Sequence, residues 1–135
     1  MQSGKGLTLI ELIVAIFIVG ILASVSVSMM HGHIDSAKWS EGKAIAGTIA
    51  RALRTHISEQ SGSFTAVPSL AQLGFESGDL NGTYFSGGES GEGDFLWVIN
   101  SNNPIDFLVT ATAPESITTP SQITLDHTGA FTETP

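Results

Sequence analysis

Glu11 is the residue whose position most needs a chemical explanation, because it is the one charged residue between Leu7 and Met30. A carboxylate inside an apolar helix costs roughly 2.5–3.5 kcal/mol at the centre of a bilayer, and less near the membrane surface. A signal segment that is cut off and discarded has no use for that cost. A helix kept by the mature protein could use Glu11 to neutralise a cation on a neighbouring chain, such as a free α-amine. Glu11 therefore favours a retained helix.

A short polar leader precedes the apolar run, contains Lys5 and ends in Gly6. A basic leader before an apolar run is typical of a targeting segment. Two processing sites are consistent with it. Cleavage between Gly6 and Leu7 would leave the apolar run in the mature chain, whereas an ordinary signal peptidase would cut within residues 24–26 and remove it.

The glycine-rich, acidic stretch Gly87–Asp94 has the composition of a cation-binding loop. Oxygen-rich loops suit hard cations such as calcium, but the spacing does not match an EF-hand, so no ligands are assigned. The alternative is a flexible hairpin loop. No lysine follows the glycines as in a phosphate-binding loop, and Glu92 stands where a nucleophile elbow needs its second glycine.

The remaining residues that could do chemistry do not form a recognisable constellation. His31 and His33 point about 200° apart on a helix, so they cannot chelate one metal as a pair four residues apart could. His56 and His127 are isolated in sequence, and the absence of cysteine excludes disulfides, thiol catalysis and Cys-ligated metals. We therefore predict no catalytic residue, no metal ligand and no cofactor, with calcium left open, and we expect a protein that is not an enzyme.

Charge divides the chain into two different halves. Residues 1–59 carry five basic and four acidic residues, a net charge of +1, whereas residues 60–135 carry nine acidic residues and no Lys or Arg, a net charge of −9. An acidic surface repels polyanions. We expect no nucleic-acid partner for the second half.

The apolar run is long enough to cross a membrane. The 24 residues from Leu7 to Met30 would form about 36 Å of helix, against a bilayer core of about 30 Å. The helical pattern then continues in a stripe that repeats every four residues: Ile45, Ile49, Leu53 and Ile57. No proline occurs before Pro68. We predict one helix from about Leu7 to about Ser58, with Gly62 as its C-cap.

The acidic half predicts a small antiparallel sheet. Its β-type runs are Thr83–Ser86, Asp94–Asn100, Ile105–Ala113, Gln122–Asp126 and Ala130–Thr134. His127–Gly129 predicts a tight hairpin turn, and Pro68–Gly74 a single helical turn that stops at Gly74. Packed on the stripe of the long helix, these strands would bury one two-layer core that includes Trp97. Trp39 is expected to anchor at the membrane interface or to pack between subunits.

The run Gly6-Leu7-Thr8-Leu9-Ile10-Glu11-Leu12 resembles the processing motif of type IV pilins and of the pseudopilins of type II secretion systems. The resemblance implies cleavage between Gly6 and Leu7 by a prepilin peptidase, followed by N-methylation of Leu7. It also implies that Glu11 pairs with the N-terminus of an adjacent subunit. Leu7 stands where the family usually has Phe or Met. Residues 23–29 lack the proline that many members carry.

These observations predict an α+β, pilin-like fold in which a long N-terminal helix packs on a small antiparallel sheet. Residues 1–6 would be the leader peptide, and residues 7–30 the transmembrane and assembly helix. Residues 31–135 would be the globular domain, with a helix at 31–59, a loop at 60–82 and a sheet at 83–135. The weaker resemblance of the acidic tail to small pilins agrees with this division. The resemblance to major pseudopilins implies that a bound calcium ion could hold the C-terminal end, in place of strand pairing.

The predicted function is that of a structural subunit of a type IV pilus-like filament. The alternatives are a type II secretion pseudopilin or, in a different class, a membrane-anchored periplasmic binding module or enzyme. The expected partners are like subunits, prepilin peptidase, an inner-membrane assembly platform and membrane lipid. The expected location is the bacterial inner membrane, with the globular domain in the periplasm, and then an extracellular pilus or a periplasmic pseudopilus.

Overall fold

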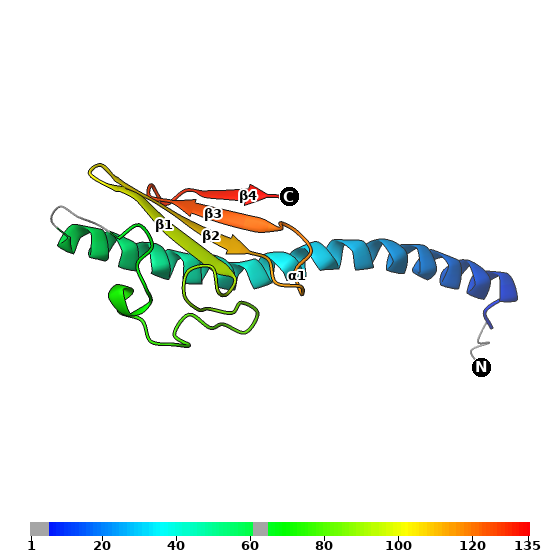
Figure 1. Cartoon of the computed structure of the whole chain (residues 1–135). Coiled ribbons are helices and arrows are strands. Elements are labelled where there is room, and N and C mark those ends of the chain that lie inside the picture. The colour runs from blue at the N-terminus through cyan, green and yellow to red at the C-terminus, as the bar shows by residue number, and fades with distance from the viewer. Residues whose placement is uncertain (1–5, 61–64) are drawn as a thin grey trace, which may run out of the picture. The chain divides into compact units, whose positions relative to one another are not determined.

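The computed structural model in Figure 1 describes residues 6–60 and 65–135, except the side chains of residues 28, 29 and 31. Its elements are α1 (Leu9–Glu59), the 3-10 turn η1 (Ala71–Leu73) and four strands, β1 (Phe95–Asn102), β2 (Ile105–Thr112), β3 (Gln122–Asp126) and β4 (Phe131–Thr134). The chain divides into two compact units, Met1–Ile34 and Asp35–Pro135. We call the second unit the head domain. The predicted α+β class, one long helix with a small antiparallel sheet, is confirmed.

Helix α1 forms because its sequence contains no proline and because apolar residues dominate one side of its second half. The predicted stripe is buried in the head domain: Ile49 and Leu53 are fully buried and Ile57 is nearly so, while Ile45 is partly buried. The helix begins two residues later than predicted, at Leu9, and ends one residue later, at Glu59. The predicted C-cap Gly62 lies outside the described residues.

The sheet is an antiparallel meander in the order β1-β2-β3-β4. Cross-strand pairing places Trp97, Val109, Leu125 and Phe131 in one row on one face of the sheet. The first three are buried in the core together with the stripe of α1, and Trp97 is fully buried as predicted. Phe131, on the edge strand β4, is 42% exposed. The core therefore ends at β3, and β4 extends beyond it.

Two predicted turns are confirmed. Gly74 ends η1 with a left-handed φ of 83°, and its N–H donates to the Ala71 carbonyl at 3.1 Å. The β3–β4 turn is held by Asp126, whose carboxylate accepts the Thr128 hydroxyl at 2.6 Å and the Ala130 N–H at 3.0 Å. The Thr128 hydroxyl bond, supported by the Ala130 N–H, lowers the pKa of Asp126 below its ordinary value.

The prediction of a strand at Thr83–Ser86 is wrong. This segment is a loop whose amide donors go to helix α1 instead of to a neighbouring strand: the Glu41 carboxylate accepts the Tyr84 N–H at 2.8 Å and the Phe85 N–H at 3.2 Å. These bonds direct the Phe85 ring into the core, where it is 2% exposed. The Glu41 carboxylate thus accepts the backbone N–H groups that, in the predicted strand, would have bonded to a neighbouring strand.

Both expectations for Trp39 are also wrong. Its side chain is 2% exposed within the head domain, and its ring centroid lies 5.1 Å from that of Phe85. The indole N–H donates to the Pro120 carbonyl at 3.1 Å, which satisfies its polar atom. One turn earlier, Asp35 accepts the N–H groups of Thr118 and Thr119 at 3.1 and 3.4 Å. Trp39 therefore fastens the β2–β3 connection to α1.

Candidate N-terminal processing and assembly site

The predicted cleavage site lies just outside helix α1. Gly6, Leu7 and Thr8 are exposed and not helical, and the helix begins at Leu9. The Gly6–Leu7 peptide bond is therefore accessible without unwinding a helix, which is the local geometry that proteolytic sites favour. Lys5 and the other leader residues before Gly6 lie outside the described residues.

Gly6 itself is under no steric constraint from the described part of the chain, because a Cβ atom built there meets none of its heavy atoms within 4 Å. A glycine that packing does not require can still be required by a partner. Any demand for a small side chain at this position would therefore come from a binding partner.

Thr8 and Glu11 form a reciprocal cap on the first turn of α1. The Thr8 N–H and the Thr8 hydroxyl each donate to Glu11 Oε2 at 2.8 Å, and the Glu11 N–H donates to Thr8 Oγ1 at 3.3 Å. This is a capping box, in which two otherwise unpaired amide donors at a helix start are satisfied by the side chains of the N-cap and N3 residues. The helix therefore starts at Leu9 because Thr8 is its N-cap.

Thr8 is the site residue that the sequence analysis missed. The signal was present, because a Thr followed three residues later by a Glu, just before an apolar run, is the usual sequence pattern of a capping box. Glu11 is therefore a hydrogen-bond acceptor in its own helix as well as a charge.

The two oxygens of the Glu11 carboxylate differ in their occupation. Oε2 accepts both Thr8 donors, whereas Oε1 accepts no hydrogen bond from any residue that the structure describes. An ionised carboxylate offers about four lone-pair positions. Glu11 can therefore cap its own helix through one oxygen and accept a cationic donor from another molecule through the other.

The apolar side chains that follow Glu11 are exposed in the isolated chain, among them Ile13, Phe17 and Leu22. By length and composition, α1 is long and apolar enough to cross a membrane: its most apolar 18-residue window has a mean hydropathy of 2.7 and is 0% buried. This surface needs lipid or other protein to cover it.

The acidic loop Gly87–Asp94 uses two of its carboxylates for internal hydrogen bonds. Asp94 Oδ2 accepts the Ser86 N–H at 2.7 Å, and Glu89 Oε2 accepts the Leu70 N–H at 2.9 Å. Within residues 6–60 and 65–135, no group of three or more His, Asp or Glu side chains is placed to hold a metal ion. The structure assigns no ligands to the calcium ion that the sequence left open.

The histidines are dispersed. His33 is exposed, and the side chain of His31 is outside the described set. His56 is 8% exposed and bonds Gln60 at 3.0 Å, and His127 Nδ1 lies 3.1 Å from Asp106 Oδ1 on the sheet. His56 and His127 each have a local partner, and the described histidines do not converge on one another.

Residues 1–27 match a family model described as the prokaryotic N-terminal methylation motif, which is the signature of type IV pilins and pseudopilins. The matched residues include Gly6, Leu7, Thr8 and Glu11. No curated protein and no solved structure matches the chain. The resemblance stated from the sequence is thereby confirmed for the N-terminal segment.

Proposed function

We propose that this chain is a structural subunit of a type IV pilus-like filament, held in the bacterial inner membrane by its N-terminal helix before it polymerises. The observation that carries the proposal is the methylation motif over residues 1–27, with Glu11 inside the apolar run. The head domain would face the periplasm before assembly. Its partners would be prepilin peptidase, an assembly platform in the membrane and further subunits.

Processing would convert the leader boundary into a new charged terminus. Hydrolysis of the Gly6–Leu7 bond consumes one water molecule, leaves a carboxylate on Gly6 of the leader and creates an α-amine on Leu7 of the mature chain. At neutral pH most of that amine is protonated, because an α-amine has a pKa of about 7.7–8.0. N-methylation would replace one hydrogen of the amine with a methyl group taken from a methyl donor, with release of a proton, and the product would still be basic.

Assembly would then pair the Leu7 ammonium of one subunit with Glu11 of another. At about 4 Å and an effective dielectric constant near 20, the Coulomb attraction is about 4 kcal/mol before desolvation reduces it. Glu11 Oε1 is the oxygen left over for this contact, since Oε2 holds Thr8. Sliding one helix along another would leave both charges unpaired in an apolar surrounding, so the pairing would set the axial register.

We further propose that the protein acts by assembly and is not an enzyme. The support is that several acidic side chains have a structural role. Glu41, Asp94 and Asp126 each accept a hydrogen bond from a backbone N–H group, and these bonds hold a loop or turn in place. These carboxylates hold the head domain in shape.

A pseudopilin of a type II secretion system is the second candidate, because the same N-terminal motif serves both kinds of filament. The two assemblies differ in where they are found, since a pilus extends from the cell surface and a pseudopilus works in the periplasm. The filament's location therefore separates them.

The experiment that tests the proposal is electron microscopy of sheared surface fractions and of periplasmic fractions from cells that express the chain as their one source of this subunit. We expect filaments that an antibody against the head domain labels, and none from a Gly6→Leu variant. Since the chain itself has room for a side chain at Gly6, loss of filaments in that variant reports failed processing, not misfolding. Cells with fully processed protein and no filament in either fraction would contradict the proposal.

A further inference from the structure

A groove of about 440 Å³ separates the head-domain part of α1 from the β3–β4 hairpin. It exists because β4 continues the sheet past the edge of the core, which leaves the Phe131 ring 42% exposed beside the helix. Small residues of α1, Gly47 and Thr48, form one wall, and Leu125 and Phe131 form the other. Figure 1 shows β3 and β4 along one side of the green and cyan part of α1.

Three cations line this groove: Lys43, Arg51 and Arg54. Lys43 pairs with Glu133 at 2.9 Å in an exposed ion pair, and Arg54 donates one bond, at 3.0 Å, to the His127 carbonyl. The guanidinium of Arg51 makes no hydrogen bond or ion pair with any described residue. We call this surface the basic groove; it combines an apolar aromatic wall with an unpaired arginine.

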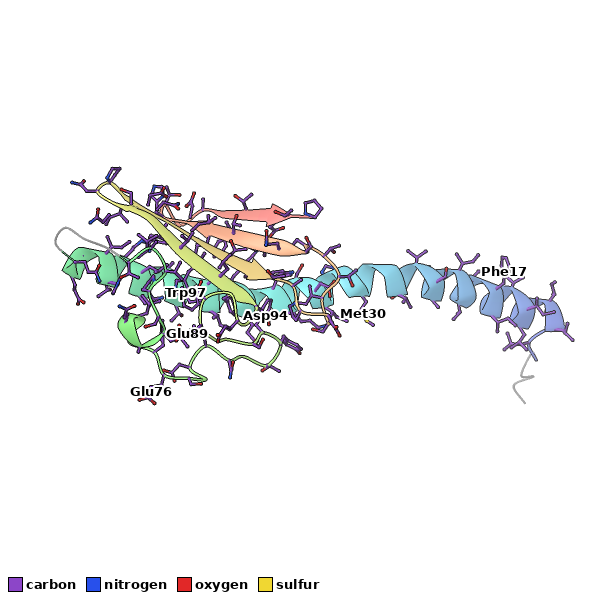
Figure 2. All side chains as sticks on the ribbon, viewed as in Figure 1. Phe17, Met30, Glu76, Glu89, Asp94 and Trp97 are labelled. Carbon is purple, nitrogen blue, oxygen red and sulfur yellow. The ribbon has the colours of Figure 1, made fainter. Side chains whose placement is uncertain are left out.

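A cleft of the opposite charge lies elsewhere on the head domain, between the η1 region and the acidic loop Gly87–Asp94. It measures about 390 Å³ and is lined by Leu70, Phe75, Glu76, Glu89 and Glu92. Glu89 is used by the Leu70 amide, but the carboxylates of Glu76 and Glu92 have no hydrogen bond or ion pair to the described part of the chain. Figure 2 shows Glu76 and Glu89 on the side of α1 away from β3 and β4. We call this surface the acidic cleft.

The charge balance identifies what the basic groove can accept. The head domain holds four basic residues, all on α1, and twelve acidic residues, a net charge of −8. A nucleic acid approaching the groove would meet the repulsion of that net charge. A second copy carries the same net charge, but its acidic cleft can place two unpaired carboxylates opposite Arg51 and bring Leu70 and Phe75 to the apolar wall of the groove, which a phosphate backbone cannot do.

We propose that the basic groove of one head domain receives the acidic cleft of the next copy, with Arg51 facing Glu76 and Glu92. Because the two surfaces are different parts of one domain, the contact is heterologous: each copy uses one surface for the preceding subunit and the other for the following one. A heterologous contact that does not close into a ring generates an open helical array. The inference rests on the proposed filament function and adds a contact between heads to the contact between helices.

Cysteine crosslinking of the full chain tests the contact cleanly, because the natural sequence has no cysteine. Thr48→Cys places a thiol in the basic groove, and Ser77→Cys places one in the acidic cleft; both positions are exposed. Oxidation of the double variant in membranes, where neighbouring chains are held close together, should give a ladder of covalent dimers, trimers and higher oligomers. Either single variant should give no ladder.

The matched control replaces the acidic-cleft thiol with Thr112→Cys, an exposed Thr on β2 outside both surfaces. Thr48→Cys with Thr112→Cys should crosslink at the level of random collision. An equal ladder from this pair would overturn the proposal, as would a crosslink of Thr48→Cys to a different protein in place of a second copy.

Charge reversal supplies the specificity test. Arg51→Glu should reduce the ladder of the Thr48/Ser77 cysteine pair by about tenfold, and adding Glu92→Arg should restore it, because the reversed charges are again complementary between neighbours. Filaments with no ladder would overturn the docking and leave the proposed function standing. A ladder without filaments in any fraction would support the docking and overturn the filament. A ladder that Arg51→Glu leaves unchanged would overturn the proposed docking of the basic groove on the acidic cleft.

Discussion

Glu11 has two tasks at the residue scale, and the structure separates the atoms that perform them. One carboxylate oxygen caps the first turn of α1 through Thr8, and the other is open to a partner. A capping box accepts glutamine as well as glutamate at this position, because the backbone needs an acceptor and not a charge. Pairing with an ammonium group needs the charge. The amide and the carboxylate can therefore be used to tell the two tasks apart.

We predict that Glu11→Gln keeps the helix start but prevents normal filament assembly, and that Glu11→Val impairs both. Thr8→Val, which removes the capping hydroxyl and keeps the charge of Glu11, should weaken the first turn by about 1 kcal/mol and reduce assembly much less. Membrane pools and sheared filaments are quantified for each fully processed variant, with no wild-type copy present. Normal filaments from Glu11→Gln would assign Glu11 to capping alone.

Glu41 is the second residue whose charge has a defined structural use. The Tyr84 N–H, which donates to its carboxylate, lowers the pKa of Glu41 below its ordinary value near 4.5. A carboxyl with a lower pKa in the folded state stabilises the fold above its unfolded pKa, and that stabilisation is lost as the pH falls through the folded pKa.

We therefore predict that the head domain loses stability on acidification below about pH 4.5, and that Glu41→Gln flattens this acid dependence. The measurement is the urea midpoint of residues 35–135 as a function of pH between neutrality and pH 3. Glu59→Gln, at an exposed position on the same helix, is the control. If both variants keep the wild-type acid slope, the bonds from Glu41 to the loop do not contribute to stability.

The docking of the Thr83–Ser86 segment on α1 is a contact between elements that requires a glycine on the helix. A Cβ at Gly42 would lie 2.7 Å from the Phe85 ring, whereas a Cβ at Gly47, further along the same helix, would meet no heavy atom within 4 Å. Alanine is the better helix former by about 1 kcal/mol in both places. At Gly42 the steric overlap with Phe85, and not helix propensity, therefore decides whether an alanine stabilises or destabilises the head domain.

We predict that Gly42→Ala destabilises the head domain by about 1–3 kcal/mol, as overpacking of a core does, and that Gly47→Ala stabilises it by about 0.5–1 kcal/mol. Chemical denaturation of the two variants gives both numbers in one experiment. Equal effects of the same sign would show that the Phe85 ring moves aside freely. Gly82, whose Cβ would overlap the Glu41 carboxylate, should behave like Gly42.

On the scale of the whole molecule, the second unit has the means to fold by itself. Residues 35–135 contain the complete sheet, the buried stripe of α1 and the core that joins them. Its net charge of −8 opposes non-specific association.

We predict that residues 35–135, expressed without the apolar run, are soluble, folded and monomeric at micromolar concentration. Circular dichroism should show a mixed helix and sheet content, and the fluorescence of Trp39 and Trp97 should be that of buried indoles, since both are 2% exposed or less. A disordered spectrum would mean that the core depends on the rest of the helix.

The features that could be predicted from the sequence are those with a local or periodic signal. The four-residue stripe predicted which face of α1 is buried, and the strands β2 and β3 lie where alternation and turn residues put them. The errors concern contacts between residues distant in sequence. Thr83–Ser86 has strand composition, but Glu41, more than 40 residues earlier, takes its amides. The sequence predicts a membrane or subunit interface for Trp39, because the loop that covers it, around Pro120, is 81 residues away.

We predict that the apolar helix stays with the mature protein after cleavage between Gly6 and Leu7. Intact mass and N-terminal sequencing of the chain purified from its native membrane test it most directly. We expect a mature chain that begins at Leu7, with the mass of one added methyl group, and an uncut chain from cells that lack the peptidase. A mature chain that begins near Val27 or Ser28 would contradict this prediction, because α1 would then have lost Glu11 and most of the membrane segment.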